Sequence, residues 1–167
     1  MEIFWGITMN FDQAFDRLIS NEGGYVNNPT DPGGETQWGI SKRSYPEVDI
    51  KRLTREGARY IYLTDFWRRG SMDQYDGAIA FQVFDAAVNH GIETAVRMLQ
   101  RAAGVADDGH IGPITVAAVK AKSVTDMLLL FLAYRIKFWT KLSTWPTFGA
   151  GWANRAAQDL IYAAEDS

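Results

Sequence analysis

The 167-residue sequence contains no cysteine, only two histidines and no large excess of charge of either sign. The lack of cysteine excludes disulfide bonds, cysteine-ligated metals and thiol nucleophiles. The two histidines, His90 and His110, belong to no motif of metal ligands, so we do not expect a zinc amidase, a metal site or any other cofactor. The formal net charge of −3 argues against a general nucleic-acid-binding protein.

We expect neither a membrane-spanning segment nor a secretion signal. Residues 127–142 are rich in apolar side chains, but they are too few to cross a bilayer and are interrupted by Arg135, Lys137 and Lys141. We interpret them as a core helix whose cations reach solvent, with binding to an outer-membrane surface as the alternative. Residues 1–9 lack a basic start and a long apolar run, so we expect a leader outside the fold rather than a signal peptide.

Apolar periodicity predicts a mainly helical domain with a small β element near its start. The first helical stripe consists of Phe11, Ala14, Phe15, Leu18 and Ile19. Further helices are predicted over about 54–67, 77–89, 92–103, from 113, from 123 to the Trp145-Pro146 pair, and around 152–160. Residues 25–40 alternate loosely between Asn-Pro and Pro-Gly-Gly breakers, a pattern that favours a short hairpin or ribbon.

Two acids and a hydroxyl frame the region between the first helix and this ribbon. Glu22 follows the predicted helix, Asp31 comes nine positions later, and Thr36 comes five positions after Asp31. Glycoside hydrolysis uses a protonated carboxylic acid together with a second group that stays ionised or positions water. A helix C-terminus and nearby aromatic rings favour the protonated form of Glu22, whereas a polar turn keeps Asp31 charged. Glu35 is an alternative second carboxylate, and ordinary helix-end and turn roles also fit these acids.

A longer motif surrounds these residues. It reads Asn21-Glu22-Gly23-Gly24-Tyr25, then Asp31, Gly33-Gly34 and Thr36-Gln37-Trp38-Gly39-Ile40-Ser41. This run resembles the signature of glycoside hydrolase family 108, which are lysozyme-like N-acetylmuramidases of phages and bacteria. The resemblance implies that Glu22 is the proton donor. It also aligns Glu22, Asp31 and Thr36 with the Glu-Asp-Thr order of phage-type lysozymes, although the gap from Asp31 to Thr36 is one residue shorter here.

A second set of motifs extends the resemblance. Residues 84–91, 99–105 and 108–113 resemble the predicted peptidoglycan-binding region that follows the catalytic region in this family. The resemblance implies a mainly α, lysozyme-like (α+β) fold in which the ribbon forms one side of a cleft. We therefore expect residues 10–167 to form one domain, with a catalytic region over about 10–75 and a helical peptidoglycan-binding-like region over about 76–165.

The function implied is that of an endolysin acting on the glycan strands of peptidoglycan. It would hydrolyse the β-1,4 bond between N-acetylmuramic acid and N-acetylglucosamine. Such an enzyme would be a monomer made in the host cytoplasm and released by a holin to the periplasmic wall. A lytic transglycosylase, which leaves 1,6-anhydro sugars, and a non-catalytic wall-binding module are the alternatives.

Three further residues are candidates for substrate binding. Tyr25 and Trp38 lie nearest the proposed site in the sequence, and their rings could stack on sugars. The amide of Asn89 could bond a sugar N-acetyl group, although a plain helix-capping role is slightly favoured because Gly91 follows it closely.

Overall fold

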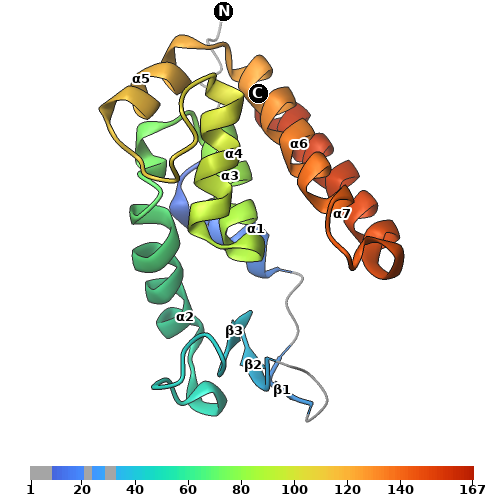
Figure 1. Ribbon diagram of the computed structural model, residues 1–167. Coiled ribbons are helices and arrows are strands. Elements are labelled where there is room, and N and C mark those ends of the chain that lie inside the picture. The colour runs from blue at the N-terminus through green and yellow to red at the C-terminus, as the bar shows by residue number, and fades with distance from the viewer. Residues whose placement is uncertain (1–8, 21–23, 29–32) are drawn as a thin grey trace, which may run out of the picture. The chain divides into compact units, whose positions relative to one another are not determined.

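The computed structural model describes residues 9–20, 24–28 and 33–167. The chain divides into two compact units (Figure 1). We call residues 11–65 the N-terminal unit, and residues 66–167 together with the described residues 9–10 the C-terminal unit. The described residues are mainly helical and include one small antiparallel sheet, as the sequence predicts.

The N-terminal unit is built on the predicted amphipathic helix. This helix, α1 (Phe11–Ile19), buries every position of its apolar stripe. Helix α2 (Arg55–Tyr62) begins after Thr54, whose Oγ1 accepts a hydrogen bond of 3.0 Å from the Gly57 amide. The rings of Phe15 and Tyr62 lie 5.7 Å apart, centroid to centroid, so the two helices pack together through aromatic side chains.

Two ion pairs also join α1 to α2. Arg59 Nε donates to Asp12 Oδ1 at 2.8 Å, and the Arg55 guanidinium pairs with Asp16 one helical turn along. The guanidinium of Arg55 also lies 5.0 Å from the centre of the Phe15 ring. Exposed ion pairs contribute about 0–1 kcal/mol each, so they align the helices more than they stabilise them.

The predicted ribbon is a three-stranded antiparallel sheet in the order β1-β2-β3. Its strands are β1 (Val26–Asn27), β2 (Glu35–Gln37) and β3 (Ile40–Ser41). A 3₁₀ turn, η1 (Ile50–Arg52), packs near β2. After α2 the chain continues in a π-helix, η2 (Leu63–Arg68), which the sequence pattern does not distinguish from an ordinary helix.

The C-terminal unit is helical. It contains a short 3₁₀ turn, η3 (Met72–Gln74), and the helices α3 (Gly77–His90), α4 (Ile92–Ala103), α5 (Pro113–Ala121), α6 (Val124–Thr140) and α7 (Trp145–Asp166). Helix α3 is buried without interruption from Gly77 to Ala87, because α4, α6 and α7 all pack on it. Gly91 and Gly104 end α3 and α4 with φ values of 86° and 79°, which glycine adopts without strain.

One helix boundary differs from the sequence-based expectation. The Trp145-Pro146 pair does not end the helix that begins after Ser123, because α6 already stops at Thr140. The pair instead begins α7, since proline is tolerated in the first turn of a helix. The Trp145 ring lies across Gly149, where a methyl group would come within 2.8 Å of it. Figure 1 shows α6 and α7 lying side by side.

Arg135 also departs from the expectation that the cations of α6 reach solvent. Lys137 and Lys141 are exposed, but the Arg135 side chain is 0% exposed. Its Nη1 donates to Asp85 Oδ2 at 2.7 Å and to Asp159 Oδ2 at 2.9 Å. Two carboxylates from other helices thus replace the water that the guanidinium loses on burial. Within the described ranges, no helix is both long enough and apolar enough to cross a membrane.

The predicted leader lies almost wholly outside the described residues, which begin at Met9. The main chain of Met9 packs against the first residue of α3. A methyl group on Gly77 would lie 2.5 Å from both the nitrogen and the oxygen of Met9, so only glycine fits there without a shift.

Candidate active site

Glu22 and Asp31, the two predicted catalytic carboxylates, lie outside the described residues. The structure describes the parts of the chain that precede and follow them. Helix α1 ends at Ile19, three positions before Glu22. The Ser20 amide still donates to the Asp16 carbonyl at 3.0 Å, and the Ser20 hydroxyl donates to the Arg17 carbonyl at 2.9 Å. The chain therefore leaves α1 just before Glu22, where the unpaired carbonyls of a helix end carry partial negative charge.

Thr36 occupies the middle of the central strand β2. It pairs with Val26 of β1 on one side and with Ser41 of β3 on the other. Because directly opposed residues of antiparallel strands point to the same face, Thr36, Val26 and Ser41 share one face of the sheet. Val26 is 52% exposed, and Thr36 and Ser41 are half-buried, so this face is most open to solvent at its β1 end.

Glu35 lies on the opposite face of β2. Its Oε1 accepts a 2.6 Å hydrogen bond from the Tyr25 hydroxyl, which raises the pKa of Tyr25. Ile40, which pairs with Gln37 on this face, is 2% exposed, whereas Asn27, which pairs with Glu35, is exposed, so this face is buried at its β3 end and open at its β1 end. Thr36 and Glu35 therefore cannot act from the same face, and Tyr25 shares the face of Glu35.

Trp38 forms the tight turn between β2 and β3 together with Gly39. Their φ values of 53° and 75° are those of a type I′ turn, which suits the twist of a two-residue hairpin. A left-handed conformation costs a bulky residue about 1–2 kcal/mol. Two hydrogen bonds offset that cost: Trp38 Nε1 donates to the Leu53 carbonyl at 3.1 Å, and Tyr62 Oη donates to the Trp38 carbonyl at 3.0 Å.

The indole of Trp38 is half-buried and its N–H group is engaged, so its visible role is to anchor the ribbon beside α2. Gln37 adds a feature that the sequence does not reveal. Its Oε1 is buried and has no hydrogen-bond partner among the described residues. The stacking of Trp38 on a sugar stays a prediction.

Asn89 lies in the last turn of α3, in the C-terminal unit. Its Nδ2 donates to the Asp85 carbonyl at 2.7 Å, one helical turn back. This bond is local to α3 and adds to the helical bonding of that carbonyl, so the capping interpretation also stays a prediction. The side chain is exposed, and the predicted contact with a sugar stays untested.

His90 is the last residue of α3. Its Nε2 accepts a 3.3 Å bond from Arg135 Nε, and its ring lies 5.1 Å from the Phe138 ring. Burial, together with the Arg135 charge, lowers the pKa of His90 to about 4. Among the residues with described positions, no group of three or more histidines and acids could hold a metal ion.

Comparison with known proteins identifies the family. The family model Glycosyl hydrolase 108 matches residues 15–91, and the model Predicted Peptidoglycan domain matches residues 94–157. The solved structure of Brucella abortus SagA matches with 32% sequence identity and a TM-score of 0.85, over 94% of this chain and 95% of that one. The chain belongs to glycosyl hydrolase family 108. No curated protein sequence matches it.

This family 108 protein is thus a glycosidase that acts on peptidoglycan, with the mainly α, lysozyme-like fold that the sequence predicts. The two family regions meet at α3, whereas the compact units divide near residue 65. Helix α3 belongs to the hydrolase region, yet it is buried among α4, α6 and α7 of the peptidoglycan domain. Its Asp85 shares Arg135 with Asp159, so the last hydrolase helix supplies the core of the following region.

Proposed function

We propose that this family 108 glycosidase is an N-acetylmuramidase. It hydrolyses the β-1,4 bond between N-acetylmuramic acid and N-acetylglucosamine. The distance between the Glu22 and Asp31 carboxyl groups decides whether the reaction inverts or retains the stereochemistry. The observation that carries the proposal is the placement of the motif. Its acid follows the C-terminal end of α1, and its Thr36 stands in the middle strand of a ribbon, on a face that is open at its β1 end.

The proposed roles follow from those positions. Glu22 protonates the leaving oxygen, because the helix end disfavours its ionised form. Asp31 stabilises the developing positive charge or activates water, and the Thr36 hydroxyl orients that water. Glu35 is a weaker candidate, since the Tyr25 hydroxyl bonds it on the face opposite Thr36.

Substrate contacts are proposed for three residues. Tyr25 is 37% exposed and its hydroxyl bonds Glu35 on the face opposite Thr36, so a sugar stacked on its ring would lie on that face of the ribbon. Trp38 contributes mainly by fixing the ribbon, and Asn89 offers an exposed amide to a sugar N-acetyl group. We further propose that residues 10–167 work as one domain, supported by the position of α3 in the core of the C-terminal unit.

We also propose the setting of a phage-type endolysin, based on the resemblance of the Glu22–Ser41 motif. The protein would be a monomer made in the host cytoplasm and would reach the wall through a holin. Expression in a Gram-negative host with and without a co-expressed holin tests this, because lysis should require the holin. Lysis without it would contradict this part of the proposal.

Analysis of the digestion products tests the reaction itself. Purified peptidoglycan should yield fragments with reducing N-acetylmuramic acid ends, identified by mass spectrometry before and after borohydride reduction. Fragments with 1,6-anhydro ends would show a lytic transglycosylase instead. Binding without release of fragments would show a wall-binding module. Glu35→Gln provides the matched control for Glu22→Gln, since it removes a carboxylate from the face of the ribbon opposite Thr36.

A further inference from the structure

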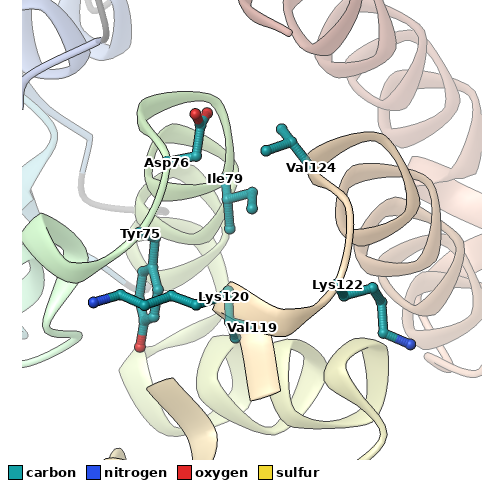
Figure 2. A pocket seen from close by; sticks show the side chains of 7 residues that line it. All are labelled: Tyr75, Asp76, Ile79, Val119, Lys120, Lys122 and Val124. Atoms are coloured by element: carbon teal, nitrogen blue, oxygen red, sulfur yellow. The ribbon is translucent and has the colours of Figure 1, made fainter. Parts of the chain in front are cut away.

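Two neighbouring cavities lie in the C-terminal unit and share Lys120. The smaller, of about 170 Å³, lies between the start of α3, the end of α5 and the start of α6 (Figure 2). The larger, of about 600 Å³, lies between the η3 turn and the first turns of α5. Ser71 and Gln74 line it on one side, and Pro113 and Val116 on the other.

Both cavities combine an apolar lining with cationic edges. Figure 2 shows Ile79 and Val124 at the smaller cavity, with the ammonium ends of Lys120 and Lys122 extending on opposite sides of it. Lys120 Nζ lies 3.4 Å from Gln74 Oε1, and neither lysine forms an ion pair with an acid in the described part of the chain. These charges are therefore available to a ligand.

One acid, Asp76, also lines the smaller cavity. Its Oδ1 accepts a 2.9 Å hydrogen bond from the Ala78 amide and so caps α3. The site thus offers two cations, one carboxylate and an apolar lining. A short peptide with free carboxylates, an amine and small apolar side chains is complementary to that set.

We propose that these cavities bind the peptide stem of peptidoglycan. The inference rests on the proposed function and specifies which part of that substrate this surface recognises. In peptidoglycan the lactyl carboxyl of muramic acid is amide-linked to the stem, so the free carboxylates lie on the peptide and not on the sugars. Lys120 and Lys122 bind stem carboxylates, the stem amine lies toward Asp76, and alanine methyl groups pack on Ile79 and Val124.

The location of the cavities supports this assignment. Lys120 and Lys122 lie within residues 94–157, the part that matches the predicted peptidoglycan domain. Ser71 and Gln74 lie within the hydrolase region. The site therefore contains residues of both family regions. One surface of the C-terminal unit binds the peptide stem, whereas the bond that is cleaved belongs to the glycan strand.

Calorimetric titration with a free stem peptide tests the proposal directly. The probe is L-Ala-γ-D-Glu-diaminopimelyl-D-Ala, and the protein is the full chain. The double variant Lys120→Gln/Lys122→Gln should bind about two- to thirtyfold more weakly, since each exposed charge pair contributes about 0.2–1 kcal/mol. Lys141→Gln removes an exposed charge from the end of α6 and should bind as the parent does. Arginine at both positions should restore binding, and circular dichroism verifies that each variant is folded.

Separate measurements distinguish failure of this inference from failure of the proposed function. Cleavage of glycan strands stripped of peptide by the parent protein, without binding of the stem peptide, would overturn the inference alone. Binding of the peptide without cleavage of any glycan would overturn the muramidase proposal alone. Equal affinity of the double variant and the parent would also overturn the inference, as would binding of a ribitol-phosphate oligomer but not of the peptide.

Discussion

Replacing Arg135 by methionine should lower the free energy of unfolding by about 3–5 kcal/mol at pH 7, because the change leaves buried carboxylates without their cation. The Arg135 side chain is 0% exposed, and its Nη1 bonds both Asp85 and Asp159. The guanidinium also lies 4.7 Å from the centre of the Trp139 ring. Methionine keeps a similar length and an apolar stem, so the loss is mainly electrostatic.

The magnitude follows from the contacts. Hydrogen bonds to charged groups contribute about 1.5–3 kcal/mol each. The variant loses two such bonds to carboxylates, together with the longer bond to His90. Two effects reduce the loss. Asp85 keeps Arg155, whose Nη2 donates to Asp85 Oδ1 at 2.6 Å. Arg135 Nη2 is itself buried without a partner among the described residues, so methionine removes one unsatisfied donor.

Urea denaturation followed by tryptophan fluorescence and far-ultraviolet circular dichroism measures this change. Arg155→Met is the matched control. Arg155 is 40% exposed and Asp85 would keep Arg135, so this variant should lose only about 1 kcal/mol. A loss below about 1 kcal/mol for Arg135→Met, or equal losses for the two variants, would refute the account of the buried network.

The pH dependence of stability tests the same network from the acid side. Burial and the neighbouring Asp85 charge raise the pKa of Asp159 to about 7, from 3.8 in the unfolded chain. The folded state therefore binds this proton more tightly, and the contribution of Asp159 to stability is present below about pH 4 and lost as the pH rises toward 7.

Other groups titrate beside it. Burial acts to raise the pKa of Asp85, but Arg135 and Arg155 outweigh it and lower the pKa, so the contribution of Asp85 is lost only below about pH 4. The lowered pKa of His90 removes stability as the pH falls from about 6.5 to 4, which opposes the effect of Asp159. The difference between the parent and Asp159→Asn isolates Asp159. Relative to the parent, the variant should gain a few kcal/mol between pH 4 and pH 8. A constant difference would contradict the raised pKa.

Three further changes have distinct expected outcomes. Gly77→Ala should cost about 1–3 kcal/mol in thermal or urea denaturation, because its methyl group meets the Met9 main chain. Gly151→Ala, within α7 and with no neighbour within 4 Å, should instead stabilise the protein by about 0.5–1 kcal/mol, and a loss there would contradict the open surroundings. Trp38→Phe removes the bond to the Leu53 carbonyl and should lower both stability and peptidoglycan hydrolysis, whereas unchanged hydrolysis would show that the ribbon does not need this anchor.

Much of the fold follows from local chemistry that the sequence displays. Thr54 and Ser123 cap their helices through side-chain oxygens that accept from Gly57 and Asp126 amides, and each lies where the apolar period begins. These capping interactions join residues that are three positions apart, so they can be recognised in the sequence. The prediction that the Trp145-Pro146 pair ends a helix was wrong, because proline marks either the end of one helix or the first turn of the next.

The buried network could not be predicted, because it joins residues far apart in the sequence. Arg135 lies 50 residues from Asp85 and 24 residues from Asp159. On its own helix it resembles any exposed cation, and only the packing of α3 and α7 brings the acids to it. The division of Thr36 and Glu35 between two faces follows from strand alternation, but only once the strand itself is known.

The activity of Glu22→Gln on purified peptidoglycan, measured as release of reducing ends, tests directly whether Glu22 is the general acid. We expect Glu22→Gln to lose more than about 100-fold in activity with an unchanged unfolding transition, while Glu35→Gln keeps activity within a few-fold of the parent. Substantial hydrolysis by Glu22→Gln, or a loss in Glu35→Gln that equals it, would contradict the assignment of Glu22 as the general acid.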